Sequence, residues 1–299
     1  MKTDAEALLL FKKMIQKDPS GALSGWQLSK DPCKWNGVTC NLERVTQLDL
    51  AQSGLVGQIT LAPFASLDML ISLNLSANSL AINSTSLVQL PYGLKQLELS
   101  FSKLVGQVPE NFFSKHPNLE YVNFAFNNIT GSLPENSLLF IDKLQYLDLS
   151  YNNLTGSIAN IKIETCNSLW HLDLSGNQIQ DSLPVSLSNC TALQELSLAS
   201  NFFSGEIPRS FGELKSLQRL DISQNHLSGW IPPELGNSCA SLFELKLSNN
   251  HITGSIPPTF GSCSSLQSFD LSNNNLTGPF PDSILQNLGS LETLLLSSN

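Results

Sequence analysis

A short sequence pattern that recurs every 24 or 25 residues constrains the fold of this chain more than any other feature. The pattern reads L-x-x-L-x-L-x-x-N-x-L-x-G-x-I-P, and we count eleven copies within the 299 residues. A period of this length is typical of a solenoid, in which each copy stacks on the next and buries an apolar face that it could not bury alone. The asparagine position of the pattern falls at Ser53, Asn78, Ser102, Asn127, Asn152, Asn177, Asn201, Asn225, Asn250, Asn274 and Asn299.

The positions within one copy predict its local structure. Leucines such as Leu172 and Leu174 alternate along a short strand and point into the core. A glycine such as Gly205 allows a tight bend, and the following Ile-Pro pair favours an extended chain. We therefore predict an α/β-type leucine-rich-repeat solenoid. It would be a right-handed superhelix with a parallel concave sheet, short strands on the flank, and 3-10 or one-turn helices on the convex side.

The first 44 residues do not follow the repeat and predict a separate terminal unit. Apolar side chains between Ala5 and Ile15 fall near one face of a helix, and Cys33 and Cys40 come after them. A solenoid needs an atypical unit to cover the exposed end of its core. We therefore predict a helical N-terminal cap, closed by a short disulfide loop, over residues 1–44.

Residues 45–299 are predicted to contain only repeats. The last copy stops at Asn299, and no closing cap follows it, so we expect a truncated repeat at this end. The N-terminus lacks the apolar stretch of a signal peptide, which suggests a mature chain whose signal has been removed.

Composition limits the partners and the compartment. The net charge is −9, with 25 acidic and 16 basic residues, which argues against nucleic acid or an anionic membrane surface as a partner. No run of eighteen apolar residues predicts a membrane span. The six cysteines show no zinc-ligand spacing, and together with several glycosylation sequons they favour an oxidising, secretory environment. We expect an extracellular chain that needs no cofactor.

Four of the cysteines occupy one position of the repeat. Cys166 and Cys190 lie one repeat apart, and so do Cys239 and Cys263. Adjacent turns lie about 4.8 Å apart where strands pair, and a disulfide accepts a Cα separation of about 4.4–6.8 Å. Two disulfides between neighbouring repeats are therefore possible, and four buried free thiols are the alternative.

Asn-x-Ser/Thr sequons predict N-linked glycans on the repeats. Asn189 is the weakest candidate because it lies beside Cys190. The six candidate sites are Asn74, Asn83, Asn128, Asn153, Asn189 and Asn275.

Aromatic residues gather at outward positions of repeats three to six, on the predicted concave face. An exposed aromatic cluster on a rigid surface is a typical anchor for a partner. The alternative is that the rings only pack on one another or lie beneath glycans. One column contains Phe101, Phe126 and Tyr151, a second contains Tyr121, Tyr146 and His171, and Trp170 lies next to them.

No residue cluster in the sequence predicts catalysis. A neighbouring outward column is rich in carboxylates, from Asp49 to Asp270, but an open face leaves these groups solvated and favours a structural role. His226 and His251 lie one repeat apart, and two ligands alone do not make a metal site. We therefore predict a chain without enzymatic activity.

The cap sequence DAEALLLFKKMI…W…DPCKWNGVTC and the LTGSIP-type repeats resemble plant leucine-rich-repeat receptor kinases. The segments NFFSKHPNLEYV, SFGELKSLQRLDIS and LSGWIPPELGNSCASL are similar to the brassinosteroid-receptor group, most of all to its vascular-highway type. This resemblance implies the N-terminal part of an ectodomain on the outer face of the plasma membrane. A transmembrane helix and a cytoplasmic Ser/Thr kinase would follow it in the full-length relative.

The resemblance also bears on ligands. In the brassinosteroid-receptor group the steroid binds an island domain inserted between late repeats, and no insertion breaks the spacing here, so we expect no steroid binding. We predict a recognition module in hormone or developmental signalling, whose partner is a protein, a peptide or a co-receptor kinase ectodomain. The alternative is a secreted inhibitor of microbial cell-wall-degrading enzymes, similar to polygalacturonase-inhibiting proteins.

Overall fold

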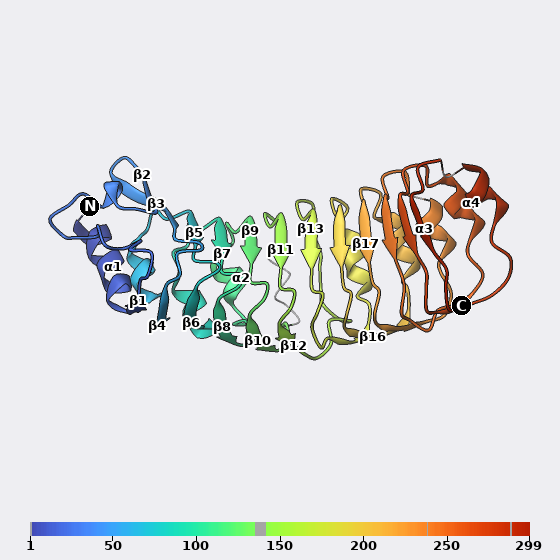
Figure 1. Cartoon of the computed structure of the whole chain (residues 1–299), viewed down its shortest axis with the longest axis horizontal. Coiled ribbons are helices and arrows are strands. Elements are labelled where there is room, and N and C mark those ends of the chain that lie inside the picture. Colours follow the sequence, from blue (N-terminus) through green and yellow to red (C-terminus); the bar gives the residue numbers. More distant parts are fainter. Residues whose placement is uncertain (1, 135–141, 238, 288) are drawn as a thin grey trace. The chain divides into compact units, whose positions relative to one another are not determined.

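The computed structural model describes residues 2–134, 142–237, 239–287 and 289–299. The chain divides into two compact units, Met1–Asn153 and Leu154–Asn299, and each is described here by itself. In each unit the first strands of the stacked repeats lie side by side in a sheet, which we call the main sheet of that unit (Figure 1). Most of the second strands of the repeats form smaller sheets, which we call the flank sheets.

The N-terminal cap forms around aromatic side chains. Trp26 and Trp35 are buried and stack with ring centroids 5.3 Å apart, and Phe11 lies 5.2 Å from Phe64 of the first repeat. The side chain of Asp31 accepts a hydrogen bond from the backbone N–H of Cys33, which caps the first 3-10 helix. The elements of the cap are α1 (Lys2–Lys13), β1 (Ile15–Lys17), η1 (Pro32–Lys34) and β2 (Val38–Asn41).

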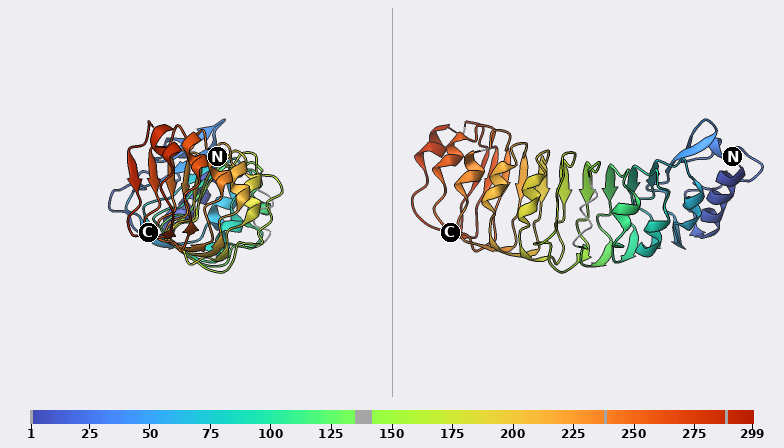
Figure 2. Two further views of the ribbon diagram at one scale, coloured as in Figure 1. Left: turned by 90° about the vertical axis from the view of Figure 1, so that its right-hand side faces the viewer. Right: turned by 180° about the vertical axis from the view of Figure 1, so that it is seen from behind.

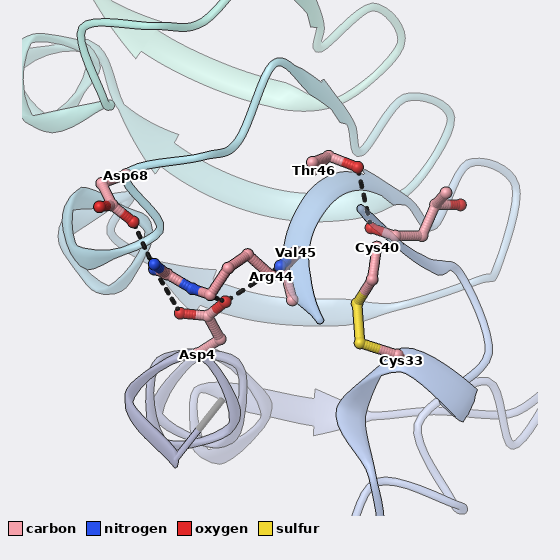
Figure 3. A network of polar contacts seen from close by, with 8 residues as sticks. Asp4, Cys33, Cys40, Arg44, Val45, Thr46 and Asp68 are labelled. Carbon is pink, nitrogen blue, oxygen red and sulfur yellow. Dashed lines mark hydrogen bonds and ion pairs between the residues drawn. A yellow bond between two sulfur atoms is a disulfide. The ribbon is translucent and has the colours of Figure 1, made fainter. Parts of the chain in front are cut away.

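A buried ion pair joins the cap to the repeats (Figure 3). Asp4 is fully buried and accepts two hydrogen bonds of 3.0 Å from Arg44 and one of 3.0 Å from the backbone N–H of Val45. Arg44 also pairs with the exposed carboxylate of Asp68. The cap strand β2 continues into the sheet by pairing antiparallel with β3, so the cap closes one end of the core.

In the first unit the repeat strands of the main sheet pair in parallel and in register. The middle residue of each short strand, such as Leu73 or Val122, is buried, and its two neighbours stay partly exposed on the open face. The strands are β3 (Arg44–Asp49), β5 (Ser72–Asn74), β7 (Gln96–Glu98), β9 (Tyr121–Asn123) and β11 (Tyr146–Asp148).

The second strands and the helices complete each turn of the first unit. The second strands lie along the lower edge of Figure 1, away from the main sheet. They are β4 (Val56–Ile59), β6 (Ser79–Asn83), β8 (Lys103–Gly106), β10 (Asn128–Gly131) and, at the unit boundary, β12 (Asn153–Leu154). The helices are η2 (Ala62–Ser66), η3 (Ser84–Gln89) and α2 (Phe112–Lys115).

The second unit repeats this plan. Its main-sheet strands are β13 (His171–Asp173), β15 (Glu195–Ser197), β17 (Arg219–Asp221), β19 (Glu244–Lys246), β21 (Ser268–Asp270) and β23 (Thr293–Leu295). Its flank strands are β14 (Gln180–Ser182), β16 (Phe202–Glu206), β18 (His226–Ser228), β20 (Thr253–Gly254) and β22 (Asn275–Leu276). Its helices are η4 (Val185–Asn189), η5 (Arg209–Glu213), α3 (Pro233–Asn237), η6 (Pro258–Ser262) and α4 (Asp282–Asn287), drawn from behind in Figure 2.

The repeat asparagine satisfies backbone groups of two turns at once. Asn225 donates through Nδ2 to the carbonyls of Leu198, Ile222 and Ser223 at 3.0–3.2 Å. Its Oδ1 accepts a 3.0 Å hydrogen bond from the backbone N–H of Phe203 in the preceding turn. Loss of one such partner leaves a buried polar group unpaired and costs about 1–3 kcal/mol.

These observations confirm the predicted leucine-rich-repeat solenoid, with its parallel sheet, short flank strands, short helices and disulfide-bonded cap. Within the residues that the structure describes, no helix is both long enough and apolar enough to span a membrane.

Candidate partner-binding surface

Three aromatic rings of the first unit form an exposed stack, which we call the aromatic ladder. Phe101, Phe126 and Tyr151 are 56%, 42% and 53% exposed, respectively. Their ring centroids lie 4.2 Å and 4.4 Å apart, and the planes are tilted by only 11° and 8°. The structure therefore brings together the first predicted aromatic column and leaves it open to solvent.

The backbone under the aromatic ladder is unfavourable for bulky residues. Phe101, Phe126 and Tyr151 have φ values of 49°, 56° and 52°. This left-handed region is rarely populated by large side chains and favours Gly, Asn and Asp. In the other repeats the same position has a small or polar residue, namely Gln52, Ala77, Gly176, Ser200, Gln224, Asn249, Asn273 or Ser298. Local backbone stability therefore does not explain why three consecutive repeats have an aromatic residue at this position.

Two tyrosines form a second stack on the open face of the main sheet. Tyr121 and Tyr146 are opposite each other in the register of β9 and β11, and their ring centroids lie 4.3 Å apart. The Tyr121 hydroxyl donates to Oε2 of Glu98 at 3.1 Å. Burial, and then the charge of Glu98, raises the pKa of Tyr121. Burial, and then the charge of Asp148, raises the pKa of Tyr146, so both hydroxyls stay protonated donors.

A cavity of about 260 Å³ lies beside Tyr121 on this face. The sequence analysis did not predict it, because the cavity depends on which side chains of three neighbouring strands are short. It is lined by Ser72, Leu73, Asn74, Gln96, Glu98 and Tyr121.

The other two predicted patch residues belong to the second unit. Trp170 and His171 contact each other edge-on, with ring centroids 5.5 Å apart. His171 lies with Nδ1 2.8 Å from Oε2 of Glu195, and Oε1 of Glu195 accepts from Arg219 at 2.7 Å. Arg219 also lies with Cζ 4.8 Å above the ring of Phe243. The open face of the second unit is therefore a network of paired charges, which the sequence analysis did not find.

The carboxylate column has a structural role that can be named. Oδ1 of Asp221 accepts a 3.0 Å hydrogen bond from the backbone N–H of Ser223, two residues further on, and Oε1 of Glu98 accepts from Ser100 at 2.9 Å. Such bonds hold the turn that follows each strand. The same bond is made by Asp49, Asn74, Asn123, Asp148, Asp173 and Asp270.

The cysteines are joined in pairs. The structure has disulfides Cys33–Cys40, Cys166–Cys190 and Cys239–Cys263. The Cα atoms of the two pairs that join neighbouring repeats lie 4.5 Å and 5.0 Å apart. The alternative of four free thiols does not describe this structure.

The six sequon asparagines differ in how their side chains are engaged. Asn189 donates through Nδ2 to the carbonyl of Ile163 at 2.7 Å, so the nitrogen that would receive a glycan is already bonded. Oδ1 of Asn74 and Oδ1 of Asn83 only accept hydrogen bonds, from Ser76 and Thr85. Asn128 and Asn153 are exposed and hydrogen-bonded to each other, and Asn275 lies on β22.

His226 and His251 stack on neighbouring turns of the second unit, with ring centroids 5.9 Å apart. Both rings are exposed, and Phe202 stacks on His226 at 5.8 Å. Among the described residues, no third His, Cys, Asp or Glu joins this pair in a cluster that could hold a metal ion.

Comparison with known families places the chain. Residues 1–41 match the leucine rich repeat N-terminal domain, and residues 92–154, 167–227, 191–252 and 240–299 match leucine rich repeats. The chain therefore belongs to the leucine-rich-repeat proteins.

Its relatives are plant receptor kinases, matched over the ectodomain region. The serine/threonine-protein kinase BRI1-like 2 of Arabidopsis thaliana is 54% identical over 119 residues, which is 40% of this chain and 10% of that protein. The brassinosteroid LRR receptor kinase BRL3 of Oryza sativa subsp. japonica is 33% identical over 128 residues, again 40% of this chain and 10% of that protein. The aligned region is thus about a tenth of these curated relatives.

Solved structures agree with this assignment. The ectodomain of the Arabidopsis thaliana receptor kinase GASSHO1/SCHENGEN3, in complex with CASPARIAN STRIP INTEGRITY FACTOR 2, has a TM-score of 0.87 and 30% identity, over 99% of this chain and 35% of that chain. The Arabidopsis receptor kinase HAESA, in complex with the peptide hormone IDA and the co-receptor SERK1, has a TM-score of 0.86 and 32% identity, over 99% and 49%. A plant ice-binding protein has a TM-score of 0.78 and 27% identity, over 99% and 95%.

Proposed function

We propose that this chain is the ligand-recognition part of a plant leucine-rich-repeat receptor-like kinase. It binds a peptide or protein partner through the aromatic ladder and the neighbouring tyrosines. The observation that carries the proposal is the stack of Phe101, Phe126 and Tyr151, exposed at backbone positions where large side chains are disfavoured. Residues kept in an unfavourable conformation point to a function other than stability.

The structural neighbours support a peptide or a co-receptor as the partner class. HAESA was solved with a peptide hormone and the co-receptor SERK1, and GASSHO1/SCHENGEN3 with an integrity factor. By this analogy the chain acts in hormone or developmental signalling on the outer face of the plasma membrane. The analogy is one of fold, so the aromatic ladder provides the site-specific argument.

The test is calorimetric binding of the chain to a panel of secreted plant peptides and purified plant receptor ectodomains. The double variant Phe126→Asn with Tyr151→Asn removes the rings and places a residue type that the left-handed backbone favours. We expect it to weaken binding of the partner at least about tenfold, because aromatic anchors dominate interfaces.

The matched control is Ser200→Asn with Gln224→Asn, at the same repeat position in the second unit. We expect it to leave binding unchanged. A partner that binds the double variant Phe126→Asn with Tyr151→Asn as tightly as the unchanged chain would refute the aromatic ladder as the site. A microbial cell-wall-degrading enzyme in the same panel tests the inhibitor alternative, and a brassinosteroid tests our proposal that these repeats bind no steroid.

We further propose that Asn74, Asn83, Asn128, Asn153 and Asn275 receive N-linked glycans when a eukaryotic cell secretes the chain, and that Asn189 does not. Asn189 Nδ2 donates to the backbone carbonyl of Ile163 beside a disulfide, whereas Asn153 Nδ2 donates only to the exposed side chain of Asn128, and this difference supports the proposal. Glycopeptide mass spectrometry measures the occupancy of each site. High occupancy at Asn189 would contradict the proposal.

A further inference from the structure

We propose that Glu98 and Tyr121, whose ring stacks on that of Tyr146, form a binding pocket for an arginine side chain of a peptide partner. The proposal rests on the proposed function, because it names a chemical group that the recognition surface takes. It concerns the cavity of about 260 Å³ on the open face of the first unit.

The carboxylate in this cavity is fixed in place before any ligand arrives. Oε1 of Glu98 accepts from the backbone N–H of Ser100 at 2.9 Å, and Oε2 accepts from the Tyr121 hydroxyl at 3.1 Å. Each carboxylate oxygen can accept a second hydrogen bond. A donor that enters the cavity therefore meets an oriented acceptor and loses little entropy in ordering it.

The charge of Glu98 has no counter-charge in the described part of the chain. No ion pair among the described residues includes Glu98, and the other lining residues are Ser72, Leu73, Asn74, Gln96 and Tyr121, all of which are uncharged. Lys95, which directly precedes β7, is engaged with Glu120 at 2.8 Å. The charge of Glu98 contributes to the raised pKa of both tyrosines, as expected for a negative potential. A partly buried carboxylate without a cation favours a cationic ligand.

The second unit contains the arrangement that we propose for the ligand. Two glutamates on the same face are paired, Glu195 with Arg219 at 2.7 Å and Glu244 with Lys246 at 2.6 Å. Arg219 combines a bond to a glutamate with a position 4.8 Å above the ring of Phe243. The first unit presents the glutamate and the aromatic rings at this face without the arginine.

Arginine fits these partners better than other cations. Its planar guanidinium stacks on an aromatic ring and still donates in its plane to a carboxylate. Tyr121 and Tyr146 have half-buried rings held 4.3 Å apart, so the ring faces are rigid. The pocket therefore selects arginine over citrulline, the neutral isostere, by charge.

The chain allows a direct test by NMR because it has only four tyrosines. The ring signals of ¹³C-labelled tyrosine are followed while N-acetyl-Gly-Arg-Gly-amide is added up to about 10 mM, a range that detects weak single-residue contacts. The experiment uses the variant Ser76→Ala, which lacks the Asn74 sequon, so that no glycan covers the cavity. We expect saturable shifts of Tyr121 and Tyr146, whereas Tyr92, on the loop before β7, stays unchanged as an internal reference.

The proposal predicts two losses and one control. We expect the unchanged pocket to bind the citrulline peptide at least about tenfold more weakly than the arginine peptide. We expect the same loss when the arginine peptide is added to Glu98→Gln, because this variant keeps the acceptor for Ser100 and removes the charge. Asp270→Asn, the equivalent turn-capping residue in the second unit, leaves the shifts unchanged. Absence of shifts at Tyr121 and Tyr146 overturns the proposal, as does equal binding of citrulline or full binding to Glu98→Gln.

The outcome is separable from the proposed function. Phe126→Asn with Tyr151→Asn leaves arginine-peptide binding unchanged but removes capture of the partner. Arginine binding together with a partner that ignores the aromatic ladder would refute the proposed function and keep the pocket. A partner that depends on the aromatic ladder, with no arginine binding, would refute the pocket and keep the proposed function.

Discussion

The two units have the same backbone plan, and they differ at the outward positions of the main sheet. One register row of the first unit consists of Gln47, Ser72, Gln96, Tyr121 and Tyr146. The matching row of the second unit consists of His171, Glu195, Arg219, Glu244, Ser268 and Thr293. The first surface is neutral and aromatic beside an unpaired glutamate, and the second neutralises most of its own charges.

This difference shows which positions stability leaves free. Inward residues such as Leu97 and Leu220 are fully buried in both units and fix the repeat. Outward residues contribute little to stability, since exposed ion pairs are worth about 0–1 kcal/mol. They can therefore diverge, and we propose that the first unit uses this freedom for recognition.

The units also differ in how they join neighbouring turns beside the first leucine of the repeat. The second unit uses Cys166–Cys190 and Cys239–Cys263. The first unit has His116 at this position, buried, with Nδ1 2.8 Å from the carbonyl oxygen of Phe112 and Nε2 3.1 Å from that of Leu90 in the preceding turn. At the same position of the repeat, the second unit thus joins its turns by disulfides and the first unit by a hydrogen-bonded imidazole.

The largest expected effect is at the N-terminal cap of the first unit. Asp4→Ala removes the buried acceptor of three hydrogen bonds, two from Arg44 and one from the backbone N–H of Val45, and should cost about 3–5 kcal/mol of unfolding free energy. Denaturant unfolding measures the loss, and hydrogen exchange should assign it to the first unit. Asp68→Ala, which removes the exposed partner of Arg44, should cost less than about 1 kcal/mol. Equal effects of both changes would contradict the assigned role.

Asp4 also predicts a pH dependence. Burial acts to raise its pKa, but the hydrogen bonds from Arg44 and Val45 and the charge of Arg44 outweigh burial and lower the pKa below 3.8. A lowered folded-state pKa stabilises the protein above the unfolded-state pKa, and this stability is lost as the pH falls through the folded-state value. The unchanged chain should lose this contribution below about pH 4, and Asp4→Ala should not.

The next effect concerns the second unit. Replacing Cys166 and Cys190 together by Ser should cost about 3 kcal/mol, since the bond closes a loop of 24 residues. Hydrogen exchange should rise in the second unit and stay the same in the cap. A loss below about 1 kcal/mol would mean that stacking alone holds these turns.

The matching test in the first unit is His116→Ala, for which we expect a cost of about 2–3 kcal/mol from the cavity and the lost hydrogen bonds. Its control is Asn118→Ala, which removes an exposed bond to the neighbouring turn and should cost less than about 1 kcal/mol. Thermal and denaturant unfolding measure both. If His116→Ala leaves the free energy of unfolding unchanged, the imidazole does not join neighbouring turns as the disulfides do.

The smallest effect is at the aromatic ladder. Phe126→Asn relieves an unfavourable φ and loses ring stacking, so stability should stay the same or rise by up to about 1 kcal/mol. Gln224→Asn at the same position in the second unit should change it by less than about 0.5 kcal/mol. A loss above about 1 kcal/mol for Phe126→Asn would mean that the rings serve stability after all.

The period of the sequence was enough to predict the fold and the phase of its side chains. Because the repeat fixes which positions align, Phe101, Phe126 and Tyr151 could be placed in one column before any coordinates were known. The cysteine pairs could be recognised as possible disulfides for the same reason. The ion pair of Asp4 with Arg44 could not, because forty residues separate these side chains and no repeat relates them.

What the sequence by itself determined is the repeating scaffold, since each copy must bury its leucines against the next copy. What only the tertiary structure decided is which outward groups meet and with what exposure. The cavity at Glu98, the proton donated by Tyr121 and the bonded amide of Asn189 depend on side-chain rotamers and neighbouring turns. Periodicity aligns backbones, but hydrogen bonds and unpaired charge depend on atoms a few ångströms apart.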